Sequence, residues 1–369
     1  MIMSNQKINA GIIGATGMVG QRFITLLSDH PYFNISVLAA SPRSAGKKFS
    51  ETIEGRWKLS NPVPENVKDM IVLDASDVAK VSSLCDFVFC AVDMPKEETK
   101  KLEEAYAKAE TPVVSNNSAC RAYADVPMLI AEINDSHLAV IEKQKQRLGT
   151  KTGFIAVKPN CSIQSYVPML TPLLDYGLVS VVVSTYQAIS GAGKSFEDWP
   201  EMIDNVIPYI GGEEEKSEKE PLKIWGAVKD GIVENANSPV ITSQCIRVPA
   251  TDGHMATVFI KFKDPGKMPS KEEILKLWKD YKGEPQILDL PSAPKQFIRY
   301  FEEDNRPQTK LDRDLENGMA ISAGRLREDP AGLFDYKFIG LSHNTLRGAA
   351  GGGVLSAELL YKKGFIVNK

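Results

Sequence analysis

The sequence predicts an α/β protein in which a mostly parallel sheet is followed by a second, α+β part with a mixed or antiparallel sheet. Two observations support this prediction. Short β-rich runs alternate with helical stretches up to about residue 160, as in βαβ units. Beyond that point long β-branched runs dominate and helical stretches become fewer. The length of 369 residues allows roughly two average domains.

In the first half, each β-rich run is expected to form one strand of the parallel sheet. The first run, residues 8–15, precedes a helical stretch from Met18 to Leu27. Pro95 stands at a plausible first position of a charged helix that ends at Ala109. The other expected strands cover residues 35–41, 71–76, 85–92, 112–118 and 153–160.

The second half combines longer strands with fewer helices. Its clearest helical stretch is 271–282, and the charge-rich run 211–223 is expected to be mostly a solvated loop or helix face. The tail 348–363 begins with glycines and continues with apolar spacing suited to a helix that packs back on the first domain. The expected strands cover residues 178–190, 238–249, 254–262, 319–326 and 336–342.

The composition narrows the class of protein. With 44 Lys+Arg and 47 Asp+Glu the net charge is 44 − 47 = −3, which argues against nucleic-acid or membrane-surface binding by bulk charge. No apolar run approaches the roughly 18 residues of a membrane span, and the first residues lack a signal-peptide pattern. The five scattered cysteines form neither a disulfide framework nor a CxxC metal pair. We therefore expect a cytoplasmic enzyme or binding protein without a metal site.

A glycine-rich turn lies between the first expected strand and the first expected helix. Its spacing is GxxGxxG, and the glycines would allow close approach of the backbone to a pyrophosphate at the helix N-terminus. The position in a βαβ pattern favours a dinucleotide site over a turn that serves packing alone. The turn consists of Gly14, Ala15, Thr16, Gly17, Met18, Val19 and Gly20.

The end of the second expected strand indicates which dinucleotide would bind. An NAD site usually has Asp or Glu here to bind the ribose 2′-hydroxyl, whereas this sequence has Ser41, Arg43 and Ser44. Hydroxyls and a guanidinium suit a 2′-phosphate, so NADP(H) is the expected cofactor. The alternative is an exposed basic loop that binds no ligand.

Cys161 is the candidate nucleophile. It follows an expected strand and precedes a helical stretch, so a helix dipole is expected to lower its pKa. Ordinary buried thiols are expected at Cys85, Cys90 and Cys245, while the context of Cys120 is ambiguous.

A thiol nucleophile needs an acid/base partner, and the chain has four histidines. His254 lies in a turn-rich link between two expected strands and is the best candidate, with His343 as its rival. His30 and His137 lie in polar contexts and are expected at the surface.

Six motifs stand out along the chain. They are the glycine turn 14–20, SNNSACR (115–121), KPNCS (158–162), QAISGAG (187–193), CIRVPATDGH (245–254) and NTLRGAAGGG (344–353). They occur in the order found in aspartate-semialdehyde dehydrogenases, and the chain resembles that family over almost its whole length. The segment SPRSAGK and the insert EEEKSEKEPLK resemble the archaeal and fungal branch rather than the shorter bacterial one.

The resemblance implies a role for each motif residue. Cys161 would be the acylated nucleophile, His254 the acid/base, and Gln187 the residue that orients the substrate or acyl intermediate. Arg247 would pair with the substrate α-carboxylate in a bidentate fork. The other implied substrate contacts are Glu220 and Lys223 for the amino group and phosphate, Arg121 with Asn116 for the transferred phosphate, and Asn160. Residues near the nicotinamide would be Ser190, Gly191, Gly193 and Asn344.

The resemblance also implies a domain plan and an activity. Residues 1–158 would form a Rossmann domain for NADP, joined by the C-terminal helix 344–369, and residues 159–343 a catalytic and dimerisation domain of a homodimer or homotetramer. The implied reaction is the NADPH-dependent conversion of L-aspartyl 4-phosphate to aspartate 4-semialdehyde, a step toward lysine, threonine and methionine. The rivals are a malonyl-CoA or related CoA-thioester reductase, a more distant N-acetylglutamyl-phosphate reductase, and a non-catalytic NADP(H) sensor.

Overall fold

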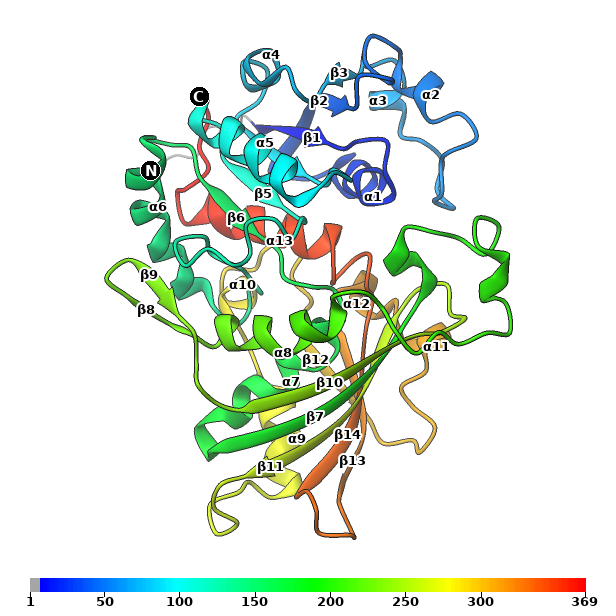
Figure 1. The fold of residues 1–369 in the computed structure, drawn as a ribbon, viewed down its shortest axis with the longest axis vertical. Coiled ribbons are helices and arrows are strands. Elements are labelled where there is room, and N and C mark those ends of the chain that lie inside the picture. The colour runs from blue at the N-terminus through cyan, green and yellow to red at the C-terminus, as the bar shows by residue number, and fades with distance from the viewer. Residues whose placement is uncertain (1–6) are drawn as a thin grey trace.

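The computed structural model describes residues 7–369, and two six-stranded sheets dominate it (Figure 1). Residues 1–6 lie outside the described residues. The expectation of no signal peptide rests largely on them. Figure 1 shows the first sheet with its helices in the upper part of the molecule and the second sheet in the lower part. No helix within residues 7–369 has the length and apolarity that crossing a membrane requires.

The first sheet is parallel throughout, as the sequence predicts, and its order is β3-β2-β1-β4-β5-β6. The order reverses between β1 and β4, and ligands of such sheets bind at this point, beyond the carboxyl ends of the strands. Several strands are shorter than expected; β3, for example, covers only Leu73–Asp74 of the expected 71–76. The strands are β1 (Ile8–Ile13), β2 (Phe33–Ala40), β3 (Leu73–Asp74), β4 (Phe87–Cys90), β5 (Val113–Ser115) and β6 (Ile155–Val157).

The helices of this half pack around the parallel sheet. Helix α1 has the predicted bounds, whereas the charged helix α5 begins one residue later than expected because the ψ of Pro95, 144°, is extended. The helices are α1 (Met18–Leu27), α2 (Phe49–Thr52), α3 (Glu65–Lys68), α4 (Val78–Ser82), α5 (Lys96–Lys108), η1 (Asp135–Val140) and α6 (Ile141–Leu148).

The second sheet is mixed, as predicted, with the order β10-β7-β11-β14-β13-β12. Its outer pairs, β10 with β7 and β12 with β13, are parallel, and the inner pairs are antiparallel. A separate hairpin joins β8 (Ala227–Lys229) and β9 (Ile232–Glu234). The strands are β7 (Leu178–Gln187), β10 (Val240–Arg247), β11 (His254–Phe262), β12 (Ile298–Phe301), β13 (Ile321–Glu328) and β14 (Tyr336–Ser342).

Short helices and α9 pack on this sheet. Buried and half-buried residues alternate along β7 and β11, so the two faces of these strands differ. Trp278 of α9 is fully buried, and its indole N–H donates to the Met169 carbonyl at 2.8 Å. The helices are η2 (Ser162–Ser165), α7 (Val167–Leu170), η3 (Thr171–Tyr176), η4 (Ile189–Ala192), η5 (Pro200–Met202), α9 (Lys271–Asp280), α10 (Glu284–Ile287), α11 (Thr309–Asp312) and α12 (Leu315–Gly318).

The charge-rich run is a helix, α8 (Glu213–Ile224), and it lies along β10. The expectation that most of the run is solvated is wrong for one of its faces, because Glu213, Ser217, Glu220 and Lys223 are buried. These positions recur at helical spacing, so the charges alternate between a buried face and a solvated one.

The C-terminal helix α13 (Ala350–Lys362) packs against α1, as predicted for the tail. It is buried from Ala350 to Leu360. Its Glu358 accepts a hydrogen bond from His30 Nε2 at 2.8 Å, and this contact anchors the helix to the segment before β2. His30 is therefore buried, contrary to the expectation of a surface residue.

Candidate active site

A pocket of about 310 Å³ brings together segments from both halves of the chain around Cys161. Several of the predicted site residues line it, and so do residues that the sequence did not single out. The predicted residues are Val19, Asn116, Arg121, Asn160, Cys161, Ser190, Gly191 and Asn344. The additional ones are Asn117, Ser118, Pro159, Glu213, Lys216, Thr345, Gly348 and Ala349.

Cys161 is half-buried at the start of the short η2 turn. Burial raises the pKa of its thiol to about 12, and the charge of Glu213 acts in the same direction. Arg121 and Arg247 favour the thiolate but do not compensate for burial. The predicted lowering of this pKa by a helix dipole is therefore wrong, because η2 has only four residues and the desolvation penalty is larger.

His254 is the first residue of β11 and is fully buried. Its Nδ1 accepts a hydrogen bond from the Ala188 N–H at 3.1 Å, so a neutral ring carries its proton on Nε2. Nε2 has no hydrogen-bond partner within residues 7–369. Burial, with the neighbouring Arg247 charge, lowers the pKa of His254 to about 3, so the ring stays neutral at physiological pH.

Gly191 lies directly over His254 and Arg247 at the pocket wall. A Cβ at this position would lie 3.0 Å from His254 Nε2 and 2.8 Å from Arg247 Nη1. Arg247 is buried at the end of β10 and donates from Nη1 to the Ala188 carbonyl at 2.7 Å. Gln187, Arg247 and His254 are buried and do not themselves line the pocket, and Gly191 is the lining residue that lies against two of them.

Glu213, at the start of α8, is the centre of a hydrogen-bond network. Its carboxylate accepts from Asn160 Nδ2 at 2.9 Å and from Gln187 Nε2 at 3.2 Å, and it pairs with Lys216 Nζ at 2.7 Å. Burial opposes its ionisation, but Lys216 and these hydrogen bonds outweigh burial and keep the pKa of the carboxyl below its ordinary value. The network therefore holds a buried carboxylate and an ammonium group against the Cys161 pocket.

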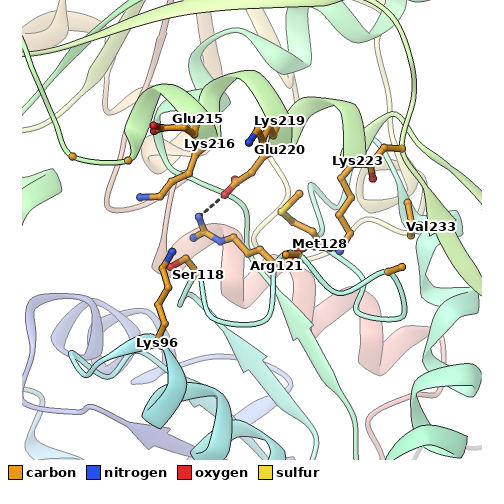
Figure 2. A pocket seen from close by; sticks show the side chains of 15 residues that line it. Lys96, Ser118, Arg121, Met128, Glu215, Lys216, Lys219, Glu220, Lys223 and Val233 are labelled. Atoms are coloured by element: carbon orange, nitrogen blue, oxygen red, sulfur yellow. Dashed lines mark hydrogen bonds and ion pairs between the residues drawn. The ribbon is translucent and has the colours of Figure 1, made fainter.

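Arg121 and Glu220 form an ion pair of 2.9 Å two turns further along the buried face of α8 (Figure 2). Arg121 also donates from Nη2 to the Asn116 carbonyl at 3.1 Å, and Glu220 accepts from the Asn160 N–H at 2.6 Å. The side-chain amide of Asn116 and Nε of Arg121 have no partner within the described residues. The guanidinium and the carboxylate are thus bound to each other, and of the two residues Arg121 is the one that lines the Cys161 pocket.

Lys223 has a different environment from the one implied by the resemblance. Its buried Nζ donates to the carbonyls of Arg121, Tyr123 and Val126 at 2.6, 2.6 and 2.9 Å. Burial lowers the pKa of Lys223 to about 8. All three donors of the ammonium group are thus used within the chain, whereas Lys216, two turns earlier, lines the pocket.

Asn344 ties together two turns beside the pocket. Its Nδ2 donates to Ser190 Oγ at 2.8 Å, and its Oδ1 accepts from the Gly253 N–H at 2.8 Å. His343, the rival acid/base candidate, is buried outside the pocket lining, with Nε2 3.5 Å from Asp314.

The remaining histidine, His137, is buried as well. It is 1% exposed, and its Nε2 lies 2.9 Å from the Gly226 carbonyl. The expectation that it is a surface residue is therefore wrong, because Nδ1 is hydrogen-bonded to Asn134 at the start of η1 and Nε2 joins η1 to the segment before β8.

The glycine turn lies at the carboxyl end of β1, at the point where the strand order reverses. A Cβ on Gly14, whose φ is +90°, would lie 2.4 Å from the Ala91 carbonyl oxygen, and one on Gly20 would lie 2.2 Å from the Gly14 oxygen. Only glycine therefore fits these two positions. The N-terminus of α1 has no side-chain cap and no acidic residue in its first turn, which leaves its N–H groups free for an anion.

Two adjoining cavities extend from this turn. One, of about 530 Å³, is lined by Gly14, Thr16, Gly17 and the end of β2. The other, of about 280 Å³, is lined by Ser41, Arg43, Ser44, Lys47, Glu51, Thr52 and Arg56. Their shared residues, Ser41, Arg43 and Arg56, supply cations and hydroxyls at the place where a 2′-phosphate would lie, so the cradle fits NADP(H).

Three polar residues were given no role by the sequence reasoning. The buried Glu213 and the half-buried Lys216 looked like part of a solvated run, although the helical spacing of Ser217, Pro221 and Ile224 marks a buried face. Lys158 is 2% exposed, its Nζ has no partner among the described residues, and burial holds its pKa well below the ordinary value. It is the first residue of the KPNCS motif, but the motif does not indicate its burial.

All five cysteines are free thiols, and four of them are buried. Within residues 7–369 no cluster of three or more His, Cys, Asp or Glu side chains is arranged to hold a metal ion. Cys161, the half-buried thiol, is the one that lines the pocket.

Comparisons with known proteins agree with this architecture. Residues 9–141 match a family model described as the NAD-binding domain of semialdehyde dehydrogenases, and residues 170–347 match one described as their dimerisation domain. A solved structure of aspartate semialdehyde dehydrogenase with NADP from Candida albicans aligns with a TM-score of 0.87 at 39% identity, covering 98% of this chain and 100% of that one.

Relatives from archaea and fungi are similar over nearly their whole length. Aspartate-semialdehyde dehydrogenase from Methanothermobacter thermautotrophicus is 43% identical over 354 residues, covering 96% of this chain and 99% of the relative. The protein of the same name from Aspergillus fumigatus is 40% identical over 369 residues, covering 98% and 99%. These similarities confirm the resemblance seen in the sequence. The chain belongs to the aspartate-semialdehyde dehydrogenase family.

Proposed function

We propose that the protein is an NADP-dependent, phosphorylating aspartate-semialdehyde dehydrogenase. The observation that carries the proposal is the pocket in which the Cys161 thiol is grouped with the cations Arg121 and Lys216, beside His254 and Arg247. A thiol can form and release an acyl group, and the cations suit a substrate with a phosphate and a carboxylate. The names of the archaeal and fungal relatives support the same substrate.

The cofactor would be held by the glycine turn and the two cavities beside it. Backbone N–H groups at the start of α1 would bind the pyrophosphate, while Ser41, Arg43 and Ser44 would bind the 2′-phosphate. Ser190, Gly191, Gly193 and Asn344 would lie beside the nicotinamide ring. When bound, NADPH supplies the hydride of the reaction.

In the acylation step, the sulfur of Cys161 bonds to the acyl carbon of the acyl phosphate and the carbon–oxygen bond to phosphate breaks. Arg121, Asn116 and Lys216 would hold the phosphate as charge develops on it. The proton of the thiol ends on the departing phosphate, so the overall charge balances. A free thiolate need not accumulate beforehand, which is consistent with the raised pKa of Cys161.

In the second step, His254 would stabilise the charge that develops on the acyl oxygen. Its Nε2–H, adjacent to Gly191, can donate a hydrogen bond to the oxygen of the hemithioacetal anion that follows hydride addition. Collapse of that anion re-forms the carbonyl, breaks the carbon–sulfur bond and releases the aldehyde, and the sulfur of Cys161 takes the net proton of the reaction from solvent. Ala188 holds the ring in the tautomer that makes this donation possible.

Substrate orientation would depend on Arg247 and Glu213. The unshared guanidinium nitrogens of Arg247 suit the α-carboxylate, and the carboxylate of Glu213 suits the α-amino group. Gln187 and Asn160 would act by positioning Glu213, to which both donate hydrogen bonds. Lys223 and Glu220 would then be structural partners of the 121–126 loop rather than direct substrate contacts.

In the proposed domain organisation, residues 1–158 together with 344–369 bind the cofactor, and residues 159–343 carry out catalysis. The second of these parts largely coincides with the match to a dimerisation domain, and we propose a homodimer or homotetramer. Half-buried apolar residues share one face of the second sheet and would form part of the subunit contact. They are Val182, Tyr186, Met255, Phe259 and Ile339.

A single substitution tests the assignment of the nucleophile. Cys161→Ala should abolish turnover while leaving the Kd for NADPH within about twofold of wild type, because the cofactor cavities do not include residue 161. Turnover is measured by the oxidation of NADPH, and the Kd by fluorescence titration with NADPH. Retention of more than a few per cent of kcat would exclude Cys161 as the acylated residue.

A further inference from the structure

A second cavity, of about 630 Å³, lies along α8 next to the Cys161 pocket (Figure 2). It is formed by α8, the loop 118–124 and the start of α5, with Val233 and Asn235 closing one end. Three residues, Ser118, Arg121 and Lys216, line both this cavity and the Cys161 pocket. The two spaces therefore meet at the wall that we assign to phosphate.

Lysines surround this shared wall. Figure 2 shows Lys216 reaching from α8 and Lys96 reaching from the start of α5 toward the guanidinium of Arg121. Lys219, one turn after Lys216, also lines the cavity. Lys96 and Lys219 line this cavity but not the Cys161 pocket, and neither forms an ion pair within the described residues.

Some of the cations at this wall are paired with a carboxylate, and others are not. Arg121 is paired with Glu220, and Lys216 with Glu213, but Nε of Arg121 is buried and has no partner within residues 7–369. Lys96 and Lys219 are exposed ammonium groups whose charge is not neutralised locally. The lining also contains Glu215 and the paired Glu220, but cations outnumber carboxylates, and an excess of one sign of charge concentrates ions of the opposite sign and speeds their entry.

We infer that this cavity is a second phosphate-binding chamber, in which Lys96 and Lys219 collect a phosphate dianion before Lys216 and Arg121 bind it beside Cys161. The inference rests on the proposed function, because that reaction consumes or releases phosphate at the shared wall. The same chemistry fits free inorganic phosphate and the phosphoryl group of an acyl phosphate. Two of its lysines, Lys96 and Lys219, have no role in the substrate-binding and catalytic set proposed above, whereas Arg121 and Lys216 belong to both.

The kinetic test uses the full chain with Lys96→Gln, Lys219→Gln and the double substitution. Lys267→Gln serves as the control, because Lys267 is exposed on the loop after β11, far along the chain from this cavity. In the oxidative direction, with aspartate semialdehyde and NADP, the double variant should raise the KM for inorganic phosphate about tenfold. The KM values for the aldehyde and for NADP, and kcat, should stay within about twofold of wild type.

The reductive direction distinguishes the two sources of phosphate. A rise in KM for L-aspartyl phosphate in the double variant would mean that the chamber also admits the acyl phosphate, and an unchanged value would limit it to free phosphate. If the double variant changes neither KM, or if Lys267→Gln changes both equally, the inference is wrong.

A second readout does not depend on turnover. Crystals soaked in sodium tungstate, a tetrahedral oxyanion, should show an anomalous peak between Lys96 and Lys219 that is separate from any peak beside Cys161, and the double variant should lose it. Tungstate beside Cys161 alone would overturn the inference. Wild-type protein without phosphate-dependent turnover but with the Lys96 peak would refute the proposed function and retain the binding chamber.

Discussion

At the scale of single residues, the chemistry depends on groups that are buried and incompletely hydrogen-bonded. Cys161 is held as a thiol by desolvation, and His254 is held as a neutral ring with a free Nε2–H. Both protonation states suit the proposed reaction, in which the thiol proton leaves with phosphate and the imidazole N–H later donates a hydrogen bond to the acyl oxygen. The sequence singled out both residues, but it predicted the wrong direction for the pKa of the thiol.

The raised pKa of Cys161 predicts slow alkylation of the free enzyme. At pH 7 a thiol of pKa about 12 is ionised to roughly one part in 10⁵, and only the thiolate reacts. The rate of inactivation by iodoacetamide should therefore increase steadily from pH 7 to pH 10 without a plateau. Cys161→Ala, followed by mass spectrometry of labelled protein, controls for the buried thiols. A plateau near pH 7 would show that the thiolate is already stable in the free enzyme.

Substitution of Gly191 is predicted to lower activity, because His254 and Arg247 lie directly against it. A Cβ there would lie within 3.0 Å of His254 and Arg247, so Gly191→Ala should push both away from the pocket. We expect a loss in kcat/KM of about 100-fold, equivalent to about 2.7 kcal/mol. Ala192→Ser, at the neighbouring exposed position, is the matched control and should stay within about threefold. Equal activity of the two variants would contradict the proposed access to His254.

At the scale of elements, helix α8 is the part of the site that the sequence described least well. Its residues looked like a solvated charge run because charged side chains outnumber apolar ones. The burial of Glu213, Ser217 and Glu220 follows from tertiary contacts with β10 and the 121–126 loop, which local composition does not encode. The glycine turn and the strands were predictable because their signals are local: backbone geometry for the turn and alternating burial for the strands.

The two lysines of α8 are predicted to behave differently when replaced. Lys216→Met should lower kcat/KM for phosphate by about 100-fold, because Lys216 lines the pocket, and it should also cost some stability, because Glu213 loses its cation. Lys223→Met should instead lower the free energy of unfolding by several kcal/mol, about 1–3 for each of the three carbonyls it leaves unpaired.

Urea unfolding and steady-state kinetics separate these effects. A stable Lys223→Met protein with a selective loss of phosphate affinity would return Lys223 to the substrate site. That result would also remove the argument for Lys216.

At the scale of the whole molecule, the fold brings the site together from segments that are far apart in the chain. The pocket joins residues from 19 to 349, and helix α13 returns from the C-terminus to pack on α1. The sequence predicted the parallel sheet, the mixed sheet and this return because each has its own hydrophobic pattern. It did not predict which polar residues meet, since Asn160, Gln187 and Glu213 come from three separate segments of the second half that meet only in the folded protein.

The central claim is that the Cys161 pocket serves a phosphorylating reaction of aspartate semialdehyde. The most direct measurement is phosphate-dependent reduction of NADP by the purified protein with aspartate semialdehyde, run beside malonate semialdehyde with CoA. The account predicts that NADP reduction requires both aspartate semialdehyde and phosphate, and that CoA does not replace phosphate. NADP reduction that depends on CoA and malonate semialdehyde instead, or no reduction with either pair, would contradict it.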